Sequence, residues 1–266
     1  MRGRKRDGRG FTLVELLVVI GIIALLISIL MPALTKARAL AVTAKCSANL
    51  HNMGLAMTMY TQQYSYYPGH CNFGSKIYAV WPTRLRNLMN GNQAVFFCPA
   101  QEPGFEWPIR TTGGDAKDAD SGFGYNTGEY LLDVFKIPFS YGYNDWGIDR
   151  EGQGSRPVKD QRGLGGDLVP SNPNLREMRA SRVKKAAEMI AIADNWTDGN
   201  WDYNIDPLNP TEYPGKIHSK GANVLFCDGH VQWYTQKELT NVGPGPGGTP
   251  AQIQMNRMWN ADNEVH

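Results

Sequence analysis

The sequence predicts an α+β protein in which a long N-terminal helix packs on an antiparallel β-sheet head with long loops. Three observations lead to this prediction. Residues 11–35 are apolar with a single ionisable side chain and, at about 1.5 Å per residue, would cross a hydrocarbon layer of about 30 Å as a helix. A helical apolar stripe extends this segment to residue 64. Beyond residue 70 come short β-like runs between stretches rich in Gly, Asp and Pro.

Charge is concentrated at the N-terminus. The chain of 266 residues has 27 basic and 25 acidic residues and a net charge of +2. Five basic residues and one acidic residue lie in the first ten positions and give them +4, so the rest of the chain carries −2. A nearly neutral body does not attract a polyanion over long range, which argues against a nucleic-acid partner.

The apolar segment predicts a single membrane span at about residues 11–33. Basic residues crowd its N-terminal side, and the positive-inside rule therefore places residues 1–10 in the cytoplasm and the chain beyond about residue 36 outside. The pattern Ala37-Arg38-Ala39 would also suit cleavage of an ordinary secretory signal, which stays an alternative. Such signals have a shorter apolar region, and they do not need a carboxylate inside it.

Glu15 is the unusual residue of the span. A charged side chain costs about 2.5–3.5 kcal/mol at the centre of a bilayer and less near its edge, so its presence indicates a function. The run from Arg9 to Glu15, Arg-Gly-Phe-Thr-Leu-Val-Glu, resembles the class III signal of type IV prepilins and type II secretion pseudopilins. A generic membrane anchor with a chance Glu is the alternative.

The resemblance implies how the chain is processed and used. A prepilin peptidase would cut after Gly10 and N-methylate Phe11, and Glu15 would pair with the terminal amine of a neighbouring subunit. Pro32 falls where many pilins kink their helix. The protein would be a non-enzymatic, single-pass protein of the bacterial inner membrane with a periplasmic head. Its partners would be lipid, the peptidase, an assembly platform and other pilin-like subunits in a pilus-like or pseudopilus filament.

Beyond Pro32 the apolar positions advance by three or four residues, as on one face of a helix. They are Ala39, Val42, Cys46, Leu50, Met53, Met57, Tyr60 and Tyr64. Tyr67-Pro68-Gly69 supplies the stop. The predicted organisation is a leader at 1–10, the pilin helix at 11–67, an α+β head at 68–242, and a flexible connection with a C-terminal tail at 243–266.

Within the head we expect a short helix at 82–89 that ends before Gly91, and strands at 94–98, 139–143 and 189–193 that pair antiparallel. Residues 223–234 predict a hairpin with a two-residue Asp228-Gly229 turn. The segments 99–130, 149–173 and 195–217 are expected to be surface loops.

Four cysteines in an exported domain favour at least partial oxidation. Cys46 lies on the inward helix face and Cys98 ends an apolar run, so their pairing is favoured, which leaves Cys71 with Cys227. Closing a loop of about fifty residues would contribute about 3–4 kcal/mol in the chain-entropy model. Buried free thiols are the alternative, and the lack of a C-x-x-C pair argues against zinc.

His218, nine intervening residues and Asp228-Gly229 form a pattern similar to the H-X9-DG proteins, large pilin-like proteins often assigned to domain of unknown function 1559. The segments 46–50, 97–99 and 140–144 also resemble that group. The resemblance supplies no reaction. We expect a structural His218–Asp228 contact that pins the hairpin, in preference to a metalloenzyme site that also uses His230.

A run of oxygen ligands from Asp194 to Asp206 provides weak calcium candidates at Asp198, Asn200, Asp202 and Asp206. Because the EF-hand pattern is absent, a solvated loop is the preferred interpretation, and we expect neither a catalytic residue nor a resident cofactor. The remaining alternative is a tethered binding module for carbohydrate or calcium, which would use Trp196, Trp201 and Tyr203 as exposed aromatics.

Overall fold

The structure is a computed structural model that describes residues 12–73, 77–107, 123–126, 129–135, 137–146, 162–165, 168, 177–195 and 202–265. Gly10 and Phe11, at the expected cleavage site, lie outside the described residues. Contacts within the chain divide it into two units, residues 1–41 and 42–266. Both contain part of the helix α1 (Leu13–Tyr64).

The helix α1 has a defined beginning and end. Thr12 Oγ1 accepts a hydrogen bond from Glu15 N (3.2 Å), and Glu15 Oε2 accepts from Thr12 N (2.9 Å), a reciprocal arrangement that satisfies two N-terminal amides. The helix runs through Pro32 and ends at Tyr64. Ser65 then adopts a left-handed conformation (φ 62°), so the helix stops before the Pro68-Gly69 pair that was expected to end it.

Every described residue of the first unit, 12–41, is exposed, and its large apolar side chains, such as Leu13 and Leu30, are 46–74% exposed. By length and composition, α1 is able to cross a membrane. An apolar face with no protein cover is what a lipid-facing segment requires.

The part of α1 in the second unit buries one face in the head. The predicted stripe is confirmed from Cys46 to Tyr60, whereas Tyr64 is half exposed. At Gly54 an added Cβ would lie 2.8 Å from Leu225 Cδ1 and 3.1 Å from Gly229 Cα. The absence of a side chain at Gly54 therefore allows the helix to approach the hairpin closely.

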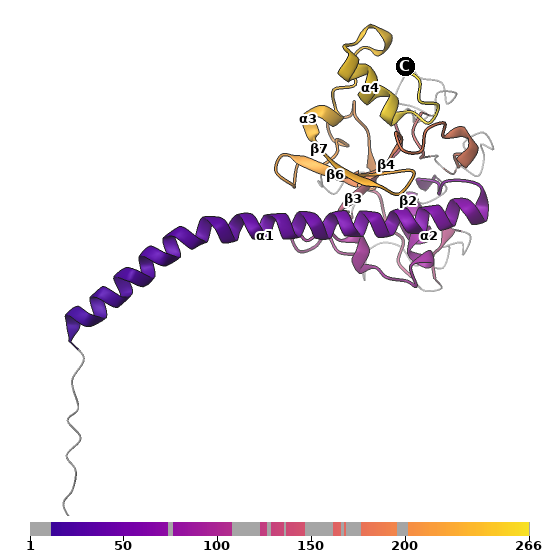
Figure 1. The fold of residues 1–266 in the computed structure, drawn as a ribbon. Coiled ribbons are helices and arrows are strands. Elements are labelled where there is room, and N and C mark those ends of the chain that lie inside the picture. Colours follow the sequence, from indigo (N-terminus) through magenta and orange to yellow (C-terminus); the bar gives the residue numbers. More distant parts are fainter. Residues whose placement is uncertain are drawn as a thin grey trace, which may run out of the picture. The chain divides into compact units, whose positions relative to one another are not determined.

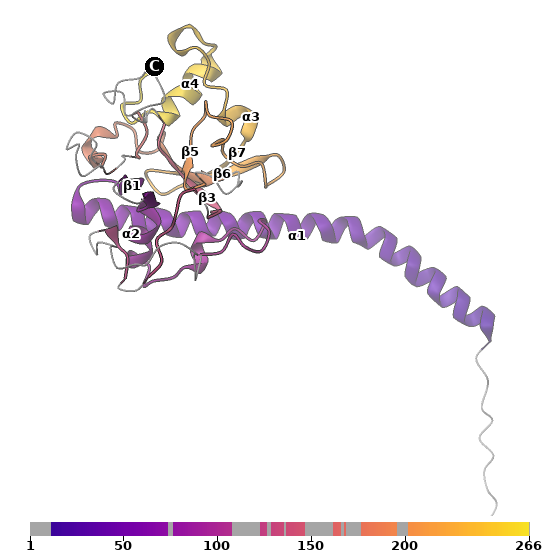
Figure 2. The ribbon, with the colours of Figure 1, turned by 180° about the vertical axis from the view of Figure 1, so that it is seen from behind.

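The head contains a five-stranded sheet in the order β5-β3-β4-β6-β7. Figures 1 and 2 show the sheet from opposite sides. Its strands are β3 (Tyr141–Asn144), β4 (Ile190–Asp194), β5 (Asn204–Ile205), β6 (Gly221–Phe226) and β7 (Val231–Thr235). The neighbours pair antiparallel as expected, except that β5 pairs parallel with β3. The strands β1 (Cys71–Phe73) and β2 (Ile77–Ala79) form a separate antiparallel pair.

Both faces of the larger sheet are covered. Ala191, Ile192 and Leu225 belong to the core that contains α1, whereas Ile190 and Val224 belong to a second core. A register shift between Ile190 and Ile192 lets consecutive residues of β4 face the same side. The helices α3 (Gln236–Leu239) and α4 (Pro250–Trp259) lie over the second face (Figure 1).

The C-terminal segment differs from the expected flexible connection and tail. A 3-10 turn at Gly245–Gly247 precedes α4, which begins with a capping box between Thr249 and Gln252. Met258 and Trp259 of α4 are buried in the second core. The Gly/Pro-rich run before α4 suggested a flexible connection, so the helix was not predicted. Its buried residues pack in the second core, which the sequence does not display.

Three local predictions of the head are confirmed and one is wrong. The helix α2 (Trp81–Leu88) and the strands β3 and β4 lie within one or two residues of their predicted positions. The expected strand at 94–98 is instead a 3-10 helix, Ala94–Phe96, whose N-terminal amide at Ala94 donates to Asn92 Oδ1 (3.1 Å). A short apolar run is compatible with either structure when it is buried.

The predicted hairpin is present as β6 and β7, but its turn is longer than expected. Phe226 N donates to His230 O (2.9 Å) and Gly229 N donates to Phe226 O (2.9 Å), so the loop has three residues, 227–229. Gly229 has a φ of +93°, which is the conformation that the last position of such a loop requires.

Candidate functional sites

A disulfide between Cys46 and Cys98 joins α1 to the segment after the 3-10 helix, with the Cα atoms 5.3 Å apart. This is the pair that the sequence favours. One turn further along the helix, Asn49 Nδ2 donates to Phe97 O (2.9 Å) and to Tyr141 Oη (3.3 Å). Helix, loop and strand β3 are therefore connected at one buried point by covalent and hydrogen bonds.

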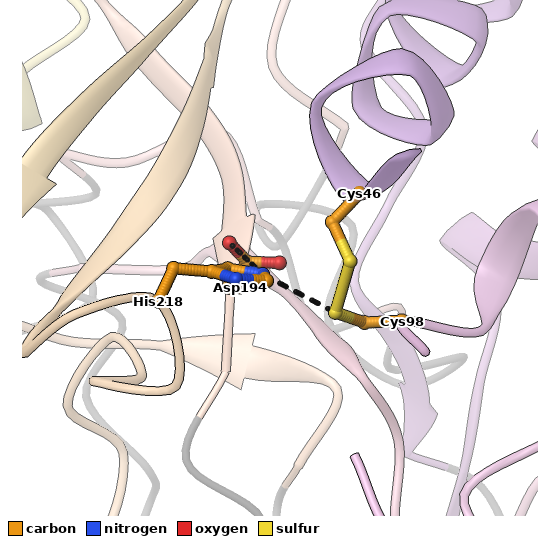
Figure 3. A group of neighbouring side chains, drawn as sticks. All are labelled: Cys46, Cys98, Asp194 and His218. Atoms are coloured by element: carbon orange, nitrogen blue, oxygen red, sulfur yellow. Dashed lines mark hydrogen bonds and ion pairs between the residues drawn. A yellow bond between two sulfur atoms is a disulfide. The ribbon is translucent and has the colours of Figure 1, made fainter. Parts of the chain in front are cut away.

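His218 lies beside this disulfide. Its Nε2 is 3.3 Å from Cys98 Sγ and 3.4 Å from Asp194 Oδ2, and its Nδ1 is 3.1 Å from Thr43 Oγ1 of α1. In Figure 3, dashed lines join the ring to the Asp194 carboxylate and to the Cys98 sulfur. We call Cys46, Cys98, Asp194 and His218 the buried tetrad, because none is more than 3% exposed.

The carboxylate of the buried tetrad is fixed by the sheet. Asp194 is the last residue of β4, opposite Tyr141 of β3. Asn223 of β6 donates to Asp194 Oδ2 from its backbone N (2.7 Å) and from Nδ2 (2.9 Å). Burial, and then the Asp194 charge, raise the pKa of the Tyr141 phenol, as expected for a charge held in a poorly solvated interior.

A tight turn positions His218. His218 and Gly221 exchange two backbone hydrogen bonds of 3.1 Å, so Ser219 and Lys220 form a two-residue turn. Both have positive φ, 55° and 70°, which non-glycine residues rarely adopt. Trp233 Nε1 of β7 also donates to His218 O (2.8 Å), so the turn is anchored to the sheet edge.

The expected contact between His218 and Asp228 is wrong. Asp228 Oδ1 lies 2.6 Å from His230 Nδ1 at the exposed hairpin loop, and the carboxylate partner of His218 is Asp194. The antiparallel pairing of β4 with β6 places Asp194 beside His218. Asp228 lies in the hairpin loop at the other end of β6 and contacts His230. The trio His218, Asp228 and His230 thus does not form a joint site.

The loop glycine of the same motif has a different role. Gly229 O is 3.1 Å from His51 Nδ1 of α1, on the helix turn before Gly54. The two ends of the H-X9-DG pattern therefore act separately: His218 joins the buried tetrad, and Gly229 supports the contact between hairpin and helix.

The second expected disulfide is absent, since Cys71 and Cys227 are buried but not joined to each other. Cys71 lies on β1 of the small sheet, whereas Cys227 follows β6 of the large one. Burial raises the pKa of the Cys227 thiol, which also shares a hydrogen bond with Tyr67.

The acidic loop is only partly described. Asp198, Asn200, Trp196 and Trp201 lie outside the described residues.

The described part of that loop is folded. Asp202 is buried, and Asp206 Oδ1 accepts from Leu208 N (2.6 Å) and Asn209 N (3.2 Å) in a local turn. Tyr203 is fully buried and stacks on Phe139, so it is not the exposed aromatic that a binding surface would need.

The buried tetrad is the one group in the described part of the chain where three or more side chains of metal-binding type converge. Cys46, Cys98 and His218 are candidates from the sequence alone, whereas the place of Asp194 beside His218 is not. The available signal was modest: Asp194 is an acidic residue directly after the strand predicted at 189–193.

The N-terminal segment is the other candidate site. Glu15 is exposed, and its Oε2 also accepts from Thr12 Oγ1 (2.7 Å). The carboxylate thus lies at the start of a long, uncovered apolar helix.

Residues 5–31 match the prokaryotic N-terminal methylation motif. The methylation motif covers the end of the leader and the start of α1, where the sequence predicts the cleavage site and the span. It implies a pilin-like subunit that a prepilin peptidase processes, and with the apolar helix it fits a single-pass membrane-anchored protein.

The methylation motif does not extend into the head. No curated protein and no solved structure is significantly similar to the chain. The α+β architecture of the head, with its helix packed on a mixed sheet, is nonetheless consistent with a pilin-like fold.

Proposed function

We propose that the chain is a structural subunit of a type II secretion pseudopilus or of a type IV pilus-like filament. A prepilin peptidase cuts after Gly10 and methylates Phe11, and the processed subunit waits in the bacterial inner membrane with its head in the periplasm. An assembly platform then moves it into the filament. The observation that carries this proposal is that the methylation motif coincides with a helix whose described residues up to Ala41 are all exposed.

An uncovered apolar surface of this size needs either lipid or other apolar helices around it. In the membrane, lipid provides the cover. In a filament, the same surface would be buried between the helices of neighbouring subunits, with the heads facing outward. The two environments are equivalent for apolar side chains, so a subunit can move between them without a large change in solvation free energy.

Glu15 supplies the specificity that apolar contacts lack. Its carboxylate accepts hydrogen bonds from Thr12 within one chain, which partly offsets the cost of placing a charge near lipid. The ammonium group at a methylated Phe11 of a neighbouring subunit would complete the pairing. Because isolated charges in a low dielectric are costly, the pair would favour one register between subunits.

The head resembles the H-X9-DG group by the segments around the buried tetrad, and we include membership of that group in the proposal. The structure gives these segments a shared location. Cys46, Cys98 and His218 belong to the tetrad, and Tyr141 lies beside it. This placement supports a role for the segments in forming the head and in tying it to α1.

Mass spectrometry of the mature N-terminus tests the processing step. We expect the chain purified from its native membrane to begin at methylated Phe11. A chain that begins at Met1, or at Leu40 after cleavage of an ordinary signal, would overturn the proposal.

Substitution of Glu15 tests the assembly step. We expect Glu15→Ala and Glu15→Lys to abolish filament formation while membrane insertion stays unchanged, as measured by sheared-filament yield and membrane fractionation. Glu15→Gln separates the hydrogen bonds with Thr12 from the charge pairing with a neighbouring subunit, because an amide oxygen can still accept from Thr12 but carries no charge. Ser28→Ala is the matched control, since Ser28 Oγ only donates to Leu25 O of its own helix among the described contacts (2.7 Å). Normal filament yield from Glu15→Lys would contradict the charge pairing.

A further inference from the structure

We propose that the head, when Cys46 and Cys98 are reduced, binds one Zn²⁺ ion through these two thiolates, His218 and Asp194. The disulfide and the zinc-bound form are then two alternative states of the same buried tetrad. This inference concerns the second unit of the chain and does not depend on the filament proposal.

The first support is the convergence of the four ligand atoms, which all lie within 4.8 Å of one another. Zinc bonds of about 2.0–2.3 Å in a tetrahedral site separate neighbouring ligand atoms by roughly 3.3–3.8 Å. His218 Nε2 already lies 3.3 Å from Cys98 Sγ and 3.4 Å from Asp194 Oδ2. Breaking the S–S bond lets the two sulfurs move apart to complete the tetrahedron.

The second support is the orientation of the imidazole. When a histidine activates a nucleophile, the orienting carboxylate and the nucleophile usually face opposite ring nitrogens. Here the carboxylate and the sulfur both face Nε2, whereas Nδ1 faces Thr43 Oγ1 (3.1 Å). Two ligands that share one nitrogen suit a common metal ion, and the Thr43 hydroxyl can accept a hydrogen bond from Nδ1–H in the tautomer whose Nε2 lone pair coordinates zinc.

The third support comes from Asp194. Two donors of Asn223 hold its Oδ2, but its Oδ1 is buried and meets no hydrogen-bond donor among the described residues. A buried carboxylate oxygen without a partner is costly, and a cation would remove that cost. The ligand set of two sulfurs, one nitrogen and one oxygen favours zinc over calcium or magnesium.

The sequence argued against zinc because it has no C-x-x-C pair. The buried tetrad does not need such a pair, since α1, the loop after the 3-10 helix, β4 and the turn before β6 each supply one ligand. Protein side chains would fill all four coordination positions of the zinc ion, and all four side chains are buried. This is typical of a structural zinc site and not of a catalytic one.

The change between the disulfide form and the zinc-bound form moves protons and electrons to defined acceptors. Zinc entering the reduced tetrad displaces the two thiol protons to solvent, and its oxidation state does not change. Oxidation by an external disulfide removes two electrons from the Cys46 and Cys98 sulfurs, forms the S–S bond and releases the ion. The external disulfide takes up these two electrons with two protons and leaves as a dithiol.

Metal analysis of the full-length chain in detergent micelles tests the proposal. One sample is kept anaerobically reduced with a phosphine, and a second is oxidised to the Cys46–Cys98 disulfide. Both are incubated with zinc chloride, or with calcium chloride, and desalted. We expect about one zinc per chain in the reduced sample, none in the oxidised sample, and no retained calcium in either. Cobalt in place of zinc should give a thiolate-to-cobalt charge-transfer absorption only in the reduced sample.

Variants locate the site. His218→Ala, and Cys46→Ser combined with Cys98→Ser, should lose zinc, whereas His230→Ala should keep it, because His230 lies at the exposed loop outside the tetrad. Cys71→Ser combined with Cys227→Ser controls for other thiols and should also keep it. The oxidised and reduced wild-type samples require no substitution, so the comparison stands even if a variant fails to fold.

Two outcomes would overturn the inference. The first is a reduced wild-type chain that keeps its circular dichroism spectrum but retains no zinc. The second is equal zinc retention by the oxidised sample or by the His218→Ala variant, which would place the ion elsewhere.

Discussion

Lys220 lies in the turn that positions His218 before β6, and its left-handed backbone conformation costs free energy. A non-glycine residue in the left-handed region costs about 1–2 kcal/mol, and Lys220 has a φ of 70° with an exposed side chain. We expect Lys220→Gly to raise the free energy of unfolding by about 0.5–1 kcal/mol, as measured by urea denaturation of the chain in detergent. Lys237→Gly is the control, because the same substitution within the helix α3 should lower stability by up to about 1 kcal/mol. A loss of stability in Lys220→Gly would show that the turn is not strained.

At the scale of single residues, the sequence indicated the importance of His218 and Cys46 but not their surroundings. Cys46 was predictable because helical periodicity fixes which face of α1 is buried. The partner of His218 was not, since only the pairing of β4 with β6 brings Asp194 beside it. Asp228 is nearer in the sequence, but it lies in the hairpin loop and contacts His230.

Among the elements, the contact between α1 and the hairpin is the most sensitive to size. We expect Gly54→Val to destabilise the head by about 1–3 kcal/mol, because even a Cβ atom would lie 3.1 Å from Gly229 Cα. Leu55→Val, on the exposed face of the same helix, should cost only a few tenths of a kcal/mol. Thermal unfolding of both variants checks this, and equal melting temperatures would contradict the close approach.

Elements with strong local signals were predictable, and those that depend on packing were not. The spacing of apolar residues was sufficient for α1, and a two-residue Asp-Gly signal was sufficient for a hairpin although its loop is one residue longer. The 3-10 helix Ala94–Phe96 and the helix α4 have short or mixed patterns. Their conformation follows from burial against distant strands, which the sequence alone does not display.

The whole head should lose stability in alkali. Burial raises the pKa of the Cys227 thiol and of several tyrosines, including four that are at most 4% exposed, so the folded state keeps protons that the unfolded chain releases from about pH 9 upward. Because the unfolded state then binds fewer protons, the free energy of unfolding should fall as pH rises, by up to about 1.4 kcal/mol per pH unit for each group. The four tyrosines are Tyr125, Tyr141, Tyr143 and Tyr203.

Melting temperatures between pH 8 and pH 11 measure this dependence. Cys227→Ala should make the decline shallower near pH 9, where the thiol of the unfolded chain begins to ionise. A melting temperature that is constant or rises across this range would contradict the expected effect of the buried groups.

For the molecule as a whole, the α+β class and the long apolar helix followed from composition and periodicity. The two-sided cover of the sheet did not, because the apolar residues of α4 are buried in a second core that distant strands complete. The methylation motif lies within residues 5–31 and is readable from the sequence, whereas the buried tetrad combines side chains from four separate segments.

The cross-link at Cys46 also has a mechanical consequence. It joins α1 to the head well before the helix ends at Tyr64, so tension applied from the N-terminal side reaches a covalent bond soon after the Thr43–His218 contact. The buried turns beyond it, including Met53 and Met57, would bear little of that load. The head could then be pulled by its helix without the helix peeling away from the sheet, for as long as the two sulfurs stay joined.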